Sequence, residues 1–478
     1  MDEAARRGTE SVTMATSRLS SEIAFDPADG KAALAQLPRA DAVFALYGAD
    51  PKDEPYIGRT PNLRARLERL LQPSEKHPRR LQLAGRVRRI AWRLTGSEFE
   101  SLLAQFALLE EAYGAKALQR MHLRAPAFVR FLGGNLYPRV VVTHRPSQRE
   151  ADWAYGPFAS RAAAERFCEE MLKLFLLRRC SDDLHPDPGH PGCVYSEMKM
   201  CLAPCYQGCS DERYAEESQT VQRFLATRGE SRLVTLRAQR DEASARLDFE
   251  DAAALHAQVQ KVEAVRGLAS ELVRPLSQLR AVILQQSAQP DEVAVFLYEG
   301  GRLRGPAAFS TIGMRIQNEQ SGSSSLFAQP MAIEAAPESI DQGPGIRFEE
   351  NAGARERGNR ETAAAPTASS VPGQGLRPAE GSYRMEAPAV IPAPSRVARG
   401  MLELRLDEVL GKLADAGDAA NAIERQGHLA LLKRWYYRPE ARREGEVCFP
   451  GADGQWPVKA MLRSIGRVAA KSWTAQRA

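Results

Sequence analysis

Residues 180–205 read CSDDLHPDPGHPGCVYSEMKMCLAPC, and the interpretation of the rest of the chain starts from this stretch. Pro, Gly, Asp and Ser separate its cysteines; these residues favour loops and cannot form a core of their own. Most of the chain's cysteines lie between residues 180 and 209, which disfavours a set of free structural thiols. Thiolates suit either a tetrahedral zinc or an iron–sulfur cluster, and the spacing alone leaves the metal open. The candidate ligands are Cys180, Cys193, Cys201 and Cys205.

The segments around this stretch resemble a known family. LFLLRRC, which ends at Cys180, and CLAPC at residues 201–205 are similar to the cysteine-rich centre of the UvrC family of excinucleases. That family has an N-terminal GIY-YIG nuclease, the cysteine region and a UVR helical hairpin, followed by an RNase H-like nuclease and a tandem helix–hairpin–helix module. The resemblance implies that the four cysteines hold a [4Fe–4S] cluster, with zinc as the alternative, and that Cys209 lies outside the pattern. It also implies a role in nucleotide excision repair and the SOS response.

Length and composition predict a soluble multidomain protein, and the order of expected elements together with the resemblance implies an α/β (mixed) fold class. At 478 residues the chain exceeds one ordinary core, so we expect two to four domains. The sequence contains no signal peptide and no long apolar run, which predicts a cytoplasmic protein without membrane contact. Cysteines in that compartment are reduced or bound to metal.

The positive charge is concentrated in one part of the chain. The net charge of +5 says little, but eleven Lys and Arg lie between Arg59 and Arg93, against Glu68 and Glu75. Such a local excess can release counterions from a nucleic-acid backbone. We therefore favour DNA as a partner over a merely solvated charged surface.

Residues 31–118 show the element order of a small α/β domain. Leu63, Leu67, Leu70 and Leu71 share one helical face, and Ser97 with Glu100 forms a capping-box pattern. The expected elements are a helix at 31–37, strands at 42–48 and 56–58, a helix at 62–71, a strand at 88–96 and a helix at 97–113. With YIG at residues 56–58 and NLRAR at 62–66, this order resembles the GIY-YIG domain of the UvrC family.

The resemblance assigns roles to single residues, and the match is partial. Tyr56 falls on the tyrosine that acts as base or base relay, Arg59 on a position that is usually lysine, and Arg66 on the helix arginine that stabilises phosphoryl charge. Phe44 replaces the tyrosine of the first motif. Gln105 replaces the glutamate that binds Mg²⁺ or Mn²⁺, and an amide binds these ions far more weakly than a carboxylate. The chemistry needs a base, cations and a carboxylate, so the nuclease site is degenerate in this interpretation.

An alternative register places Glu110 at the metal position. This register breaks the match at residues 97–100, and we therefore prefer Gln105. The asparagine that closes the family's domain has no clear counterpart near Ala117.

Residues 119–179 resemble the family's connector, and Cys168 in it is expected to be a core thiol. Residues 210–268 are strongly helical, and LDFEDAAALHAQV at 247–259 resembles the UVR motif. In the family this hairpin docks on UvrB. The resemblance makes Phe249, Ala253 and Leu255 apolar contact or packing residues and Glu250 a polar contact, and His256 replaces the usual arginine.

The remaining chain gives weaker signals. We expect a disordered N-terminus at 1–30, a short β segment with a Gly-Gly turn at 269–315, a disordered linker at 316–398 and a helical region at 399–478. Trp435, Tyr436 and Tyr437 lie among basic residues, where helix packing is favoured over stacking on bases. No Asp-rich strand set or tandem helix–hairpin–helix pair is recognisable, so we expect no second incision module.

Three hypotheses follow. The first is a shortened UvrC homologue whose GIY-YIG domain makes one metal-dependent incision beside DNA damage. The second is a non-catalytic adapter that binds DNA and UvrB and has a degenerate nuclease site. The third is a protein of the same fold with an unrelated partner.

Overall fold

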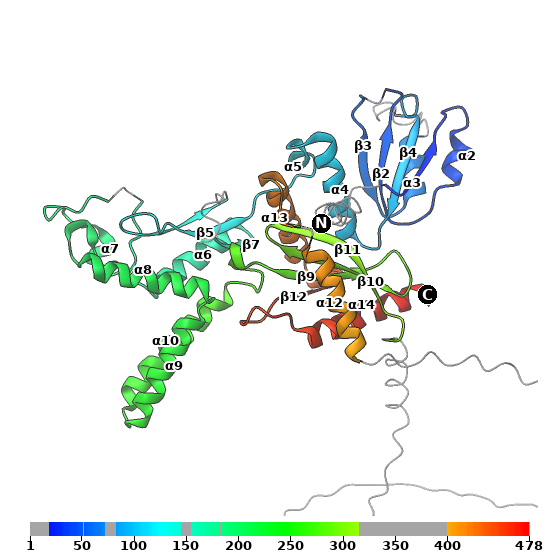
Figure 1. Ribbon diagram of the computed structural model, residues 1–478. Coiled ribbons are helices and arrows are strands. Elements are labelled where there is room, and N and C mark those ends of the chain that lie inside the picture. Colours follow the sequence, from blue (N-terminus) through cyan, green and yellow to red (C-terminus); the bar gives the residue numbers. More distant parts are fainter. Residues whose placement is uncertain are drawn as a thin grey trace, which may run out of the picture. The chain divides into compact units, whose positions relative to one another are not determined.

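The computed structural model has mixed α/β architecture (Figure 1). The expected linker at 316–398 and residues 1–18 of the expected disordered N-terminus lie outside the described residues. Within the described part, the strands form three four-stranded sheets, and all strand pairs are antiparallel. The structure describes residues 19–50, 52–71, 83–144, 154–181, 184–314, 399–415 and 417–477.

The first sheet has the order β1-β4-β2-β3. Side chains alternate in direction along β2, which places Phe44 and Leu46 on the face that α3 covers, where they pack with Leu63 and Leu67. The elements are β1 (Ser21–Ala24), α2 (Gly30–Ala35), β2 (Ala42–Tyr47), β3 (Tyr56–Thr60), α3 (Leu63–Leu71) and β4 (Arg89–Leu94).

One part of the N-terminal prediction is wrong. Residues 1–30 were expected to be disordered, but β1 pairs with β4 and Phe25 is buried in the core of this sheet. The segment contains few apolar residues, and its pairing depends on β4, which lies more than 60 residues later. A local composition argument does not detect such a contact.

The helix α4 (Glu98–Tyr113) follows the first sheet and begins as expected. Ser97 accepts a hydrogen bond from the Glu100 backbone N–H, which is one half of the predicted capping box. The other half differs, because the Glu100 carboxylate accepts from the Gly96 N–H and from Arg93 instead.

The second sheet has the order β6-β5-β7-β8 and lies in the expected connector. Its core is shared with α6 and with the helices after the cysteines. The predicted hairpin is α9 and α10, which lie side by side (Figure 1). The elements are α5 (Lys116–Arg120), β5 (Ala127–Phe131), β6 (Val140–Thr143), β7 (Ala154–Phe158), α6 (Arg161–Leu172), α7 (Val194–Glu197), α8 (Asp211–Ala226), α9 (Glu230–Ala245), α10 (Phe249–Gly267) and β8 (Arg274–Pro275).

The third sheet corrects the predicted separation of residues 269–315 from residues 399–478. Its order is β11-β10-β9-β12, so a strand of the C-terminal region, expected to be helical, pairs with β9. The predicted Gly-Gly turn is present, with positive φ at Gly300 and Gly301. The elements are β9 (Ala281–Gln286), β10 (Glu292–Glu299), β11 (Arg302–Ser310), α12 (Arg399–Ala414), α13 (Ala422–Tyr436), β12 (Glu446–Cys448) and α14 (Val458–Arg477).

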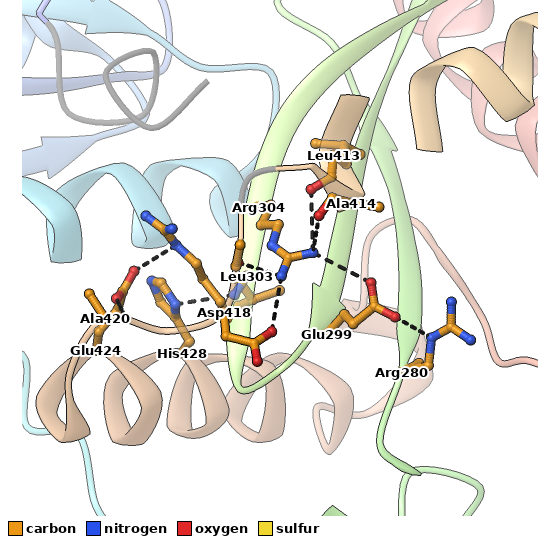
Figure 2. Close-up of polar contacts among 12 residues, drawn as sticks. Arg280, Glu299, Leu303, Arg304, Leu413, Ala414, Asp418, Ala420, Glu424 and His428 are labelled. Atoms are coloured by element: carbon orange, nitrogen blue, oxygen red, sulfur yellow. Dashed lines mark hydrogen bonds and ion pairs between the residues drawn. The ribbon is translucent and has the colours of Figure 1, made fainter. Parts of the chain in front are cut away.

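A buried polar network joins β11 of this third sheet to the C-terminal helices α12 and α13 (Figure 2). The Arg304 side chain is 3% exposed; it donates to the carbonyl oxygens of Leu413 and Ala414 at 3.3 Å and ion-pairs with Glu299 at 3.4 Å. Arg304 thereby caps the C-terminal end of α12 from β11. Nearby, Nδ1 of the buried His428 accepts a hydrogen bond from the Leu303 N–H at 3.1 Å.

The helix α4 also contacts the C-terminal region closely. Phe99, Leu102 and Phe106 pack in one cluster with residues of β9, β10 and α13. A Cβ added to Gly427 of α13 would come within 2.0 Å of the Phe106 ring, so this approach requires glycine. The expected domain at 31–118 therefore shares its last helix with the core of the third sheet.

The aromatic residues at the end of α13 serve packing, as favoured from the sequence. Trp435 is buried and donates its Nε1–H to the Glu444 carbonyl oxygen. The Tyr437 hydroxyl bonds to Ser270 and to the Pro157 carbonyl oxygen. No helix within the described ranges is long and apolar enough to cross a membrane.

Candidate functional site

The four candidate cysteine ligands line one small cavity, although up to 25 residues separate them in the sequence. Arg178 and Tyr195 are among the other residues that line it. The local fold explains this gathering: Cys193 is the N-cap residue just before α7, and left-handed residues at Ala203 and Gln207 bracket the short turn that contains Cys205. The lining cysteines are Cys180, Cys193, Cys201 and Cys205.

Two donors point at the sulfurs of this cavity. The Ala203 N–H donates to Cys201 Sγ at 3.3 Å, and the buried Arg178 guanidinium donates to Cys180 Sγ at 3.5 Å. Burial, together with the neighbouring cysteines, raises the pKa of the Cys201 thiol to about 11. A bound cation would reverse this preference, because metal coordination stabilises the thiolate.

The donor chemistry of the cavity fits a metal site. Four soft sulfur ligands are the set that zinc or an iron–sulfur cluster takes. In the described part of the chain, no three His, Cys, Asp or Glu side chains are already arranged to hold a metal ion. The four sulfurs share a cavity and would have to move closer together around a metal.

Two other cysteines have different surroundings. Cys209 is absent from the cavity lining; it packs beside the core of the second sheet, where burial and Asp211 raise its pKa. Cys168 is buried on α6, and burial raises its pKa to about 11. Both behave as packing thiols in this structure.

The predicted nuclease residues lie on two faces of the first sheet. Tyr56 and Phe44 share the face covered by α3, with their ring centroids 6.2 Å apart. A Cβ on Gly58 would come within 2.7 Å of the Phe44 ring, which explains the glycine of the YIG motif. Arg66 is half-buried on the same α3.

Arg59 points to the opposite face, toward α4, because side chains alternate along a strand. On this face Val43 and Ile57 pack with Ala104 and Leu108 of α4. Gln105 is half-buried on α4 and follows Glu98 by two helical turns, so these two residues share a side of the helix. The structure therefore groups Tyr56, Phe44 and α3 on one face, and Arg59 with α4 on the other.

Arg59 is already engaged by a carboxylate. Its guanidinium lies 3.1 Å from Glu98, and Arg438 holds the same carboxylate with two hydrogen bonds of 2.6 and 2.8 Å. The hydrogen bonds from Arg438 lower the pKa of Glu98, while burial and the nearby Arg434 and Arg438 lower the pKa of Arg59. Sequence reasoning missed Glu98 and Arg438, since their contact spans 340 positions.

The alternative ligand Glu110 also has another partner. Its carboxylate accepts a hydrogen bond from Asn421 at 3.2 Å, and burial raises its pKa. Asn421 caps the N-terminus of α13. The hydrogen bond thus directs Glu110 toward the C-terminal region.

The hairpin presents an apolar tip. Phe249 is 67% exposed at the first position of α10, and Leu247, which sequence reasoning did not single out, is 72% exposed beside it. Glu250 and Ala253 are exposed, whereas Leu255 packs against the core. Large apolar side chains exposed next to one another are typical of a docking surface.

Comparison with known proteins identifies two segments of the chain. Residues 129–224 match the family described as UvrC/Cho excinuclease, middle domain, and residues 230–265 match the UvrB/uvrC motif. The first segment contains most of β5, all of β6 and β7, and the cysteine cavity, and the second contains α9 and most of α10. No solved structure matches the chain.

Several curated relatives carry the name UvrABC system protein C. The protein from Alcanivorax borkumensis is 30% identical over 211 residues, which are 44% of this chain and 34% of the relative. The protein from Pseudomonas protegens is 28% identical, over 58% of this chain and 43% of the relative. The protein from Aromatoleum aromaticum is 28% identical, over 60% of this chain and 48% of the relative. The chain thus spans between a third and a half of the length of these relatives.

Proposed function

We propose that this chain, which belongs to the UvrC family, acts in nucleotide excision repair by binding DNA and UvrB. The observation that carries the proposal is the pairing of a UvrC-type middle domain with a hairpin whose apolar tip is exposed. A hairpin without a partner would gain no stability from exposing Leu247 and Phe249. The third hypothesis, an unrelated partner, has no comparable support.

UvrB docks on the tip of the hairpin in this proposal. Phe249 supplies the large apolar contact, since aromatic anchors dominate the free energy of many interfaces. Glu250 and the small Ala253 lie on the exposed surface beside it. Asp248 fixes the start of α10 by accepting from the Asp251 N–H, and this capping presents Phe249 at the helix end.

Binding of UvrB to single-residue variants tests the docking. We expect Phe249→Ala to weaken binding at least about tenfold, because hot-spot aromatics contribute about 2 kcal/mol or more. Leu404→Ala is the matched control: Leu404 is 59% exposed on α12, outside the hairpin. Equal UvrB affinity of Phe249→Ala and wild type would refute the docking surface.

The cysteine cavity holds a metal in the same proposal. Cys180, Cys193, Cys201 and Cys205 supply four thiolates to a [4Fe–4S] cluster, or to zinc as the alternative. Bound there, the metal would link separate parts of the segment 180–205 to one another and so stabilise the middle domain. The support is the shared cavity and the N–H donors to two of the sulfurs.

The N-terminal domain acts as a DNA-binding remnant of a GIY-YIG nuclease. The support is threefold: Gln105 replaces the metal carboxylate, Phe44 replaces a tyrosine, and Arg59 is ion-paired with Glu98. Each of these differences weakens metal binding or phosphate activation. The chain is then an adapter that positions UvrB and DNA without cutting.

Incision is the second candidate function, because Tyr56 and Arg66 are retained on the sheet face with α3. A single cut would need Mg²⁺ or Mn²⁺ in addition to these residues. Gln105→Glu restores the missing carboxylate, so the proposal predicts that only this variant gains metal-dependent cleavage. Cleavage by wild type that is lost in Tyr56→Phe would favour the enzyme over the adapter.

A further inference from the structure

Five positively charged side chains gather where the N-terminal domain meets the end of α13. We call this group the basic junction. Its members come from β3, from the segment between α5 and β5, and from the last turn of α13 and the residues just after it. They are Arg59, Arg124, Lys433, Arg434 and Arg438.

Contacts fix the members relative to one another. Arg59 and Arg438 both bind the Glu98 carboxylate, at 3.1 and 2.6 Å. Arg434 donates to the Met121 carbonyl oxygen at 3.5 Å, which brings the end of α13 to the segment that carries Arg124. Residues from sequence positions more than 300 apart therefore form one surface.

Most of this charge is not compensated. Within the described ranges, no carboxylate lies within ion-pair distance of Arg124, Lys433 or Arg434. Arg434 and Arg124 are exposed, while Arg59 and Arg438 keep 30% and 22% of their side-chain surface open. The like charges also act on one another, because Arg124 lowers the pKa of Lys433 after the effect of burial.

The helix dipole explains only part of the group. Cations near the C-terminus of α13 stabilise its free carbonyl groups, and this alone would account for Lys433 and Arg434. It does not account for Arg59 and Arg124, which other elements contribute. Gathering like charges costs free energy, and a bound polyanion would offset this cost.

We propose that the basic junction binds the phosphodiester backbone of DNA, so that the C-terminal region contributes directly to the DNA surface of the N-terminal domain. The cations are spread over three segments, which suits an extended polyanion better than a single small anion. Arginine forks match phosphate oxygens, and Glu98 holds two of these forks in place while neutralising part of their charge. The inference rests on the proposed DNA binding and assigns a surface to it.

The salt dependence of DNA binding by the full chain tests the proposal. A fluorescently labelled duplex is titrated at several KCl concentrations with wild type and with Arg124→Gln/Arg434→Gln. Each lost phosphate contact lowers the slope of log K against log[salt] by about 1, so we expect the double variant to lose about 2 and to bind more weakly. The control Lys412→Gln/Lys459→Gln removes the same charge from exposed positions elsewhere in the C-terminal region and should bind like wild type.

Glu98→Gln should raise the affinity for DNA, whereas Arg124→Gln/Arg434→Gln should lower it. Glu98→Gln keeps a hydrogen-bonding side chain but removes the negative charge, so DNA should bind more tightly than to wild type. Melting curves of each variant verify the fold. Equal slopes for wild type and Arg124→Gln/Arg434→Gln, with wild type binding DNA, would overturn the basic junction and leave the proposed function standing. A wild type that binds no DNA would overturn both.

Discussion

The cysteine cavity and the predicted nuclease residues differ in how they are placed. One segment of the sequence supplies all four sulfurs of the cavity. The predicted nuclease residues come from β2, β3, α3 and α4, and they lie on both sides of a sheet. Side chains of the C-terminal region, such as Arg438 and Asn421, bind carboxylates on α4. A site formed by one segment can keep its chemistry when distant parts of the chain change. The predicted nuclease residues, in contrast, share α4 with contacts to the C-terminal region.

The largest effect expected from this comparison is loss of metal. Cys201→Ser and Cys205→Ser should remove stoichiometric metal, because each deletes one of the four proposed ligands in one cavity. Cys209→Ser is the control, since Cys209 does not line the cavity. Elemental analysis of anaerobically purified protein gives the metal content and separates iron from zinc.

A Cys209→Ser protein without metal, or Cys201→Ser protein with full metal, would contradict the assigned ligands. Zinc without iron in wild type would replace the cluster by a zinc site and leave the ligand set unchanged.

The next effect concerns the polar network around Arg304, which joins β11 to α12 in the third sheet domain. Arg304→Met should lower the free energy of unfolding by about 3–5 kcal/mol, because Glu299 and the carbonyl groups at the end of α12 lose a buried partner. Arg399→Met, which removes an exposed pair with Glu403, should cost less than about 1 kcal/mol. Denaturant unfolding measures both.

The metal content of the Arg304→Met protein tests whether the cavity depends on the third sheet. The cavity should keep its metal in folded Arg304→Met protein, since no residue of the third sheet lines it. Loss of metal in that variant would show that the cavity is not locally built.

A smaller effect tests the approach of α13 to α4. Gly427→Ala places a methyl group where the Phe106 ring lies, and overpacking of this kind costs about 1–3 kcal/mol. Gly411→Ala is the matched control on α12, where a Cβ would meet nothing within 4 Å and should stabilise the helix by about 0.5–1 kcal/mol. Equal melting temperatures of the two variants would contradict the close packing.

The prediction about pH concerns His428. Burial lowers its pKa to about 3, so the folded protein keeps a neutral ring while the unfolded chain protonates below about 6.5. The unfolded state then binds the extra proton, and stability falls by about 1.4 kcal/mol per pH unit as pH drops from 6.5 toward 3. His428→Asn should be less stable at pH values above about 7 but lose less stability as the pH falls below about 6.5. Urea unfolding at a series of pH values measures this dependence. If the free energy of unfolding changed equally with pH in wild type and His428→Asn, the buried neutral histidine would be contradicted.

The sequence predicted the local elements well. An apolar run located β2, the Gly-Gly pair located the turn between β10 and β11, and Ser97 located the start of α4. These features depend on neighbours within a few residues, which is why periodicity and capping patterns detect them. The gathering of the four cysteines in one cavity belongs to the same class, since they lie in one segment of the sequence.

Features that depend on distant partners could not be predicted. The β12 strand is three residues long and pairs with β9 about 160 positions earlier, and no local pattern indicates it. The same holds for β1, and for the contact of Arg438 with Glu98, which places Arg59 in an ion pair. Tyr56 and Arg59 are three residues apart in the sequence, yet strand alternation sends them to opposite faces.

We propose that the chain joins UvrB and DNA without cutting the strand. The most direct test of this proposal is an assay with a labelled, lesion-bearing duplex, UvrA, UvrB, ATP and Mg²⁺ or Mn²⁺, in which complex formation and strand cleavage are followed together. We expect wild type to shift the UvrB–DNA complex while the strand stays intact. Cleavage by wild type that disappears in Tyr56→Phe would contradict the proposal.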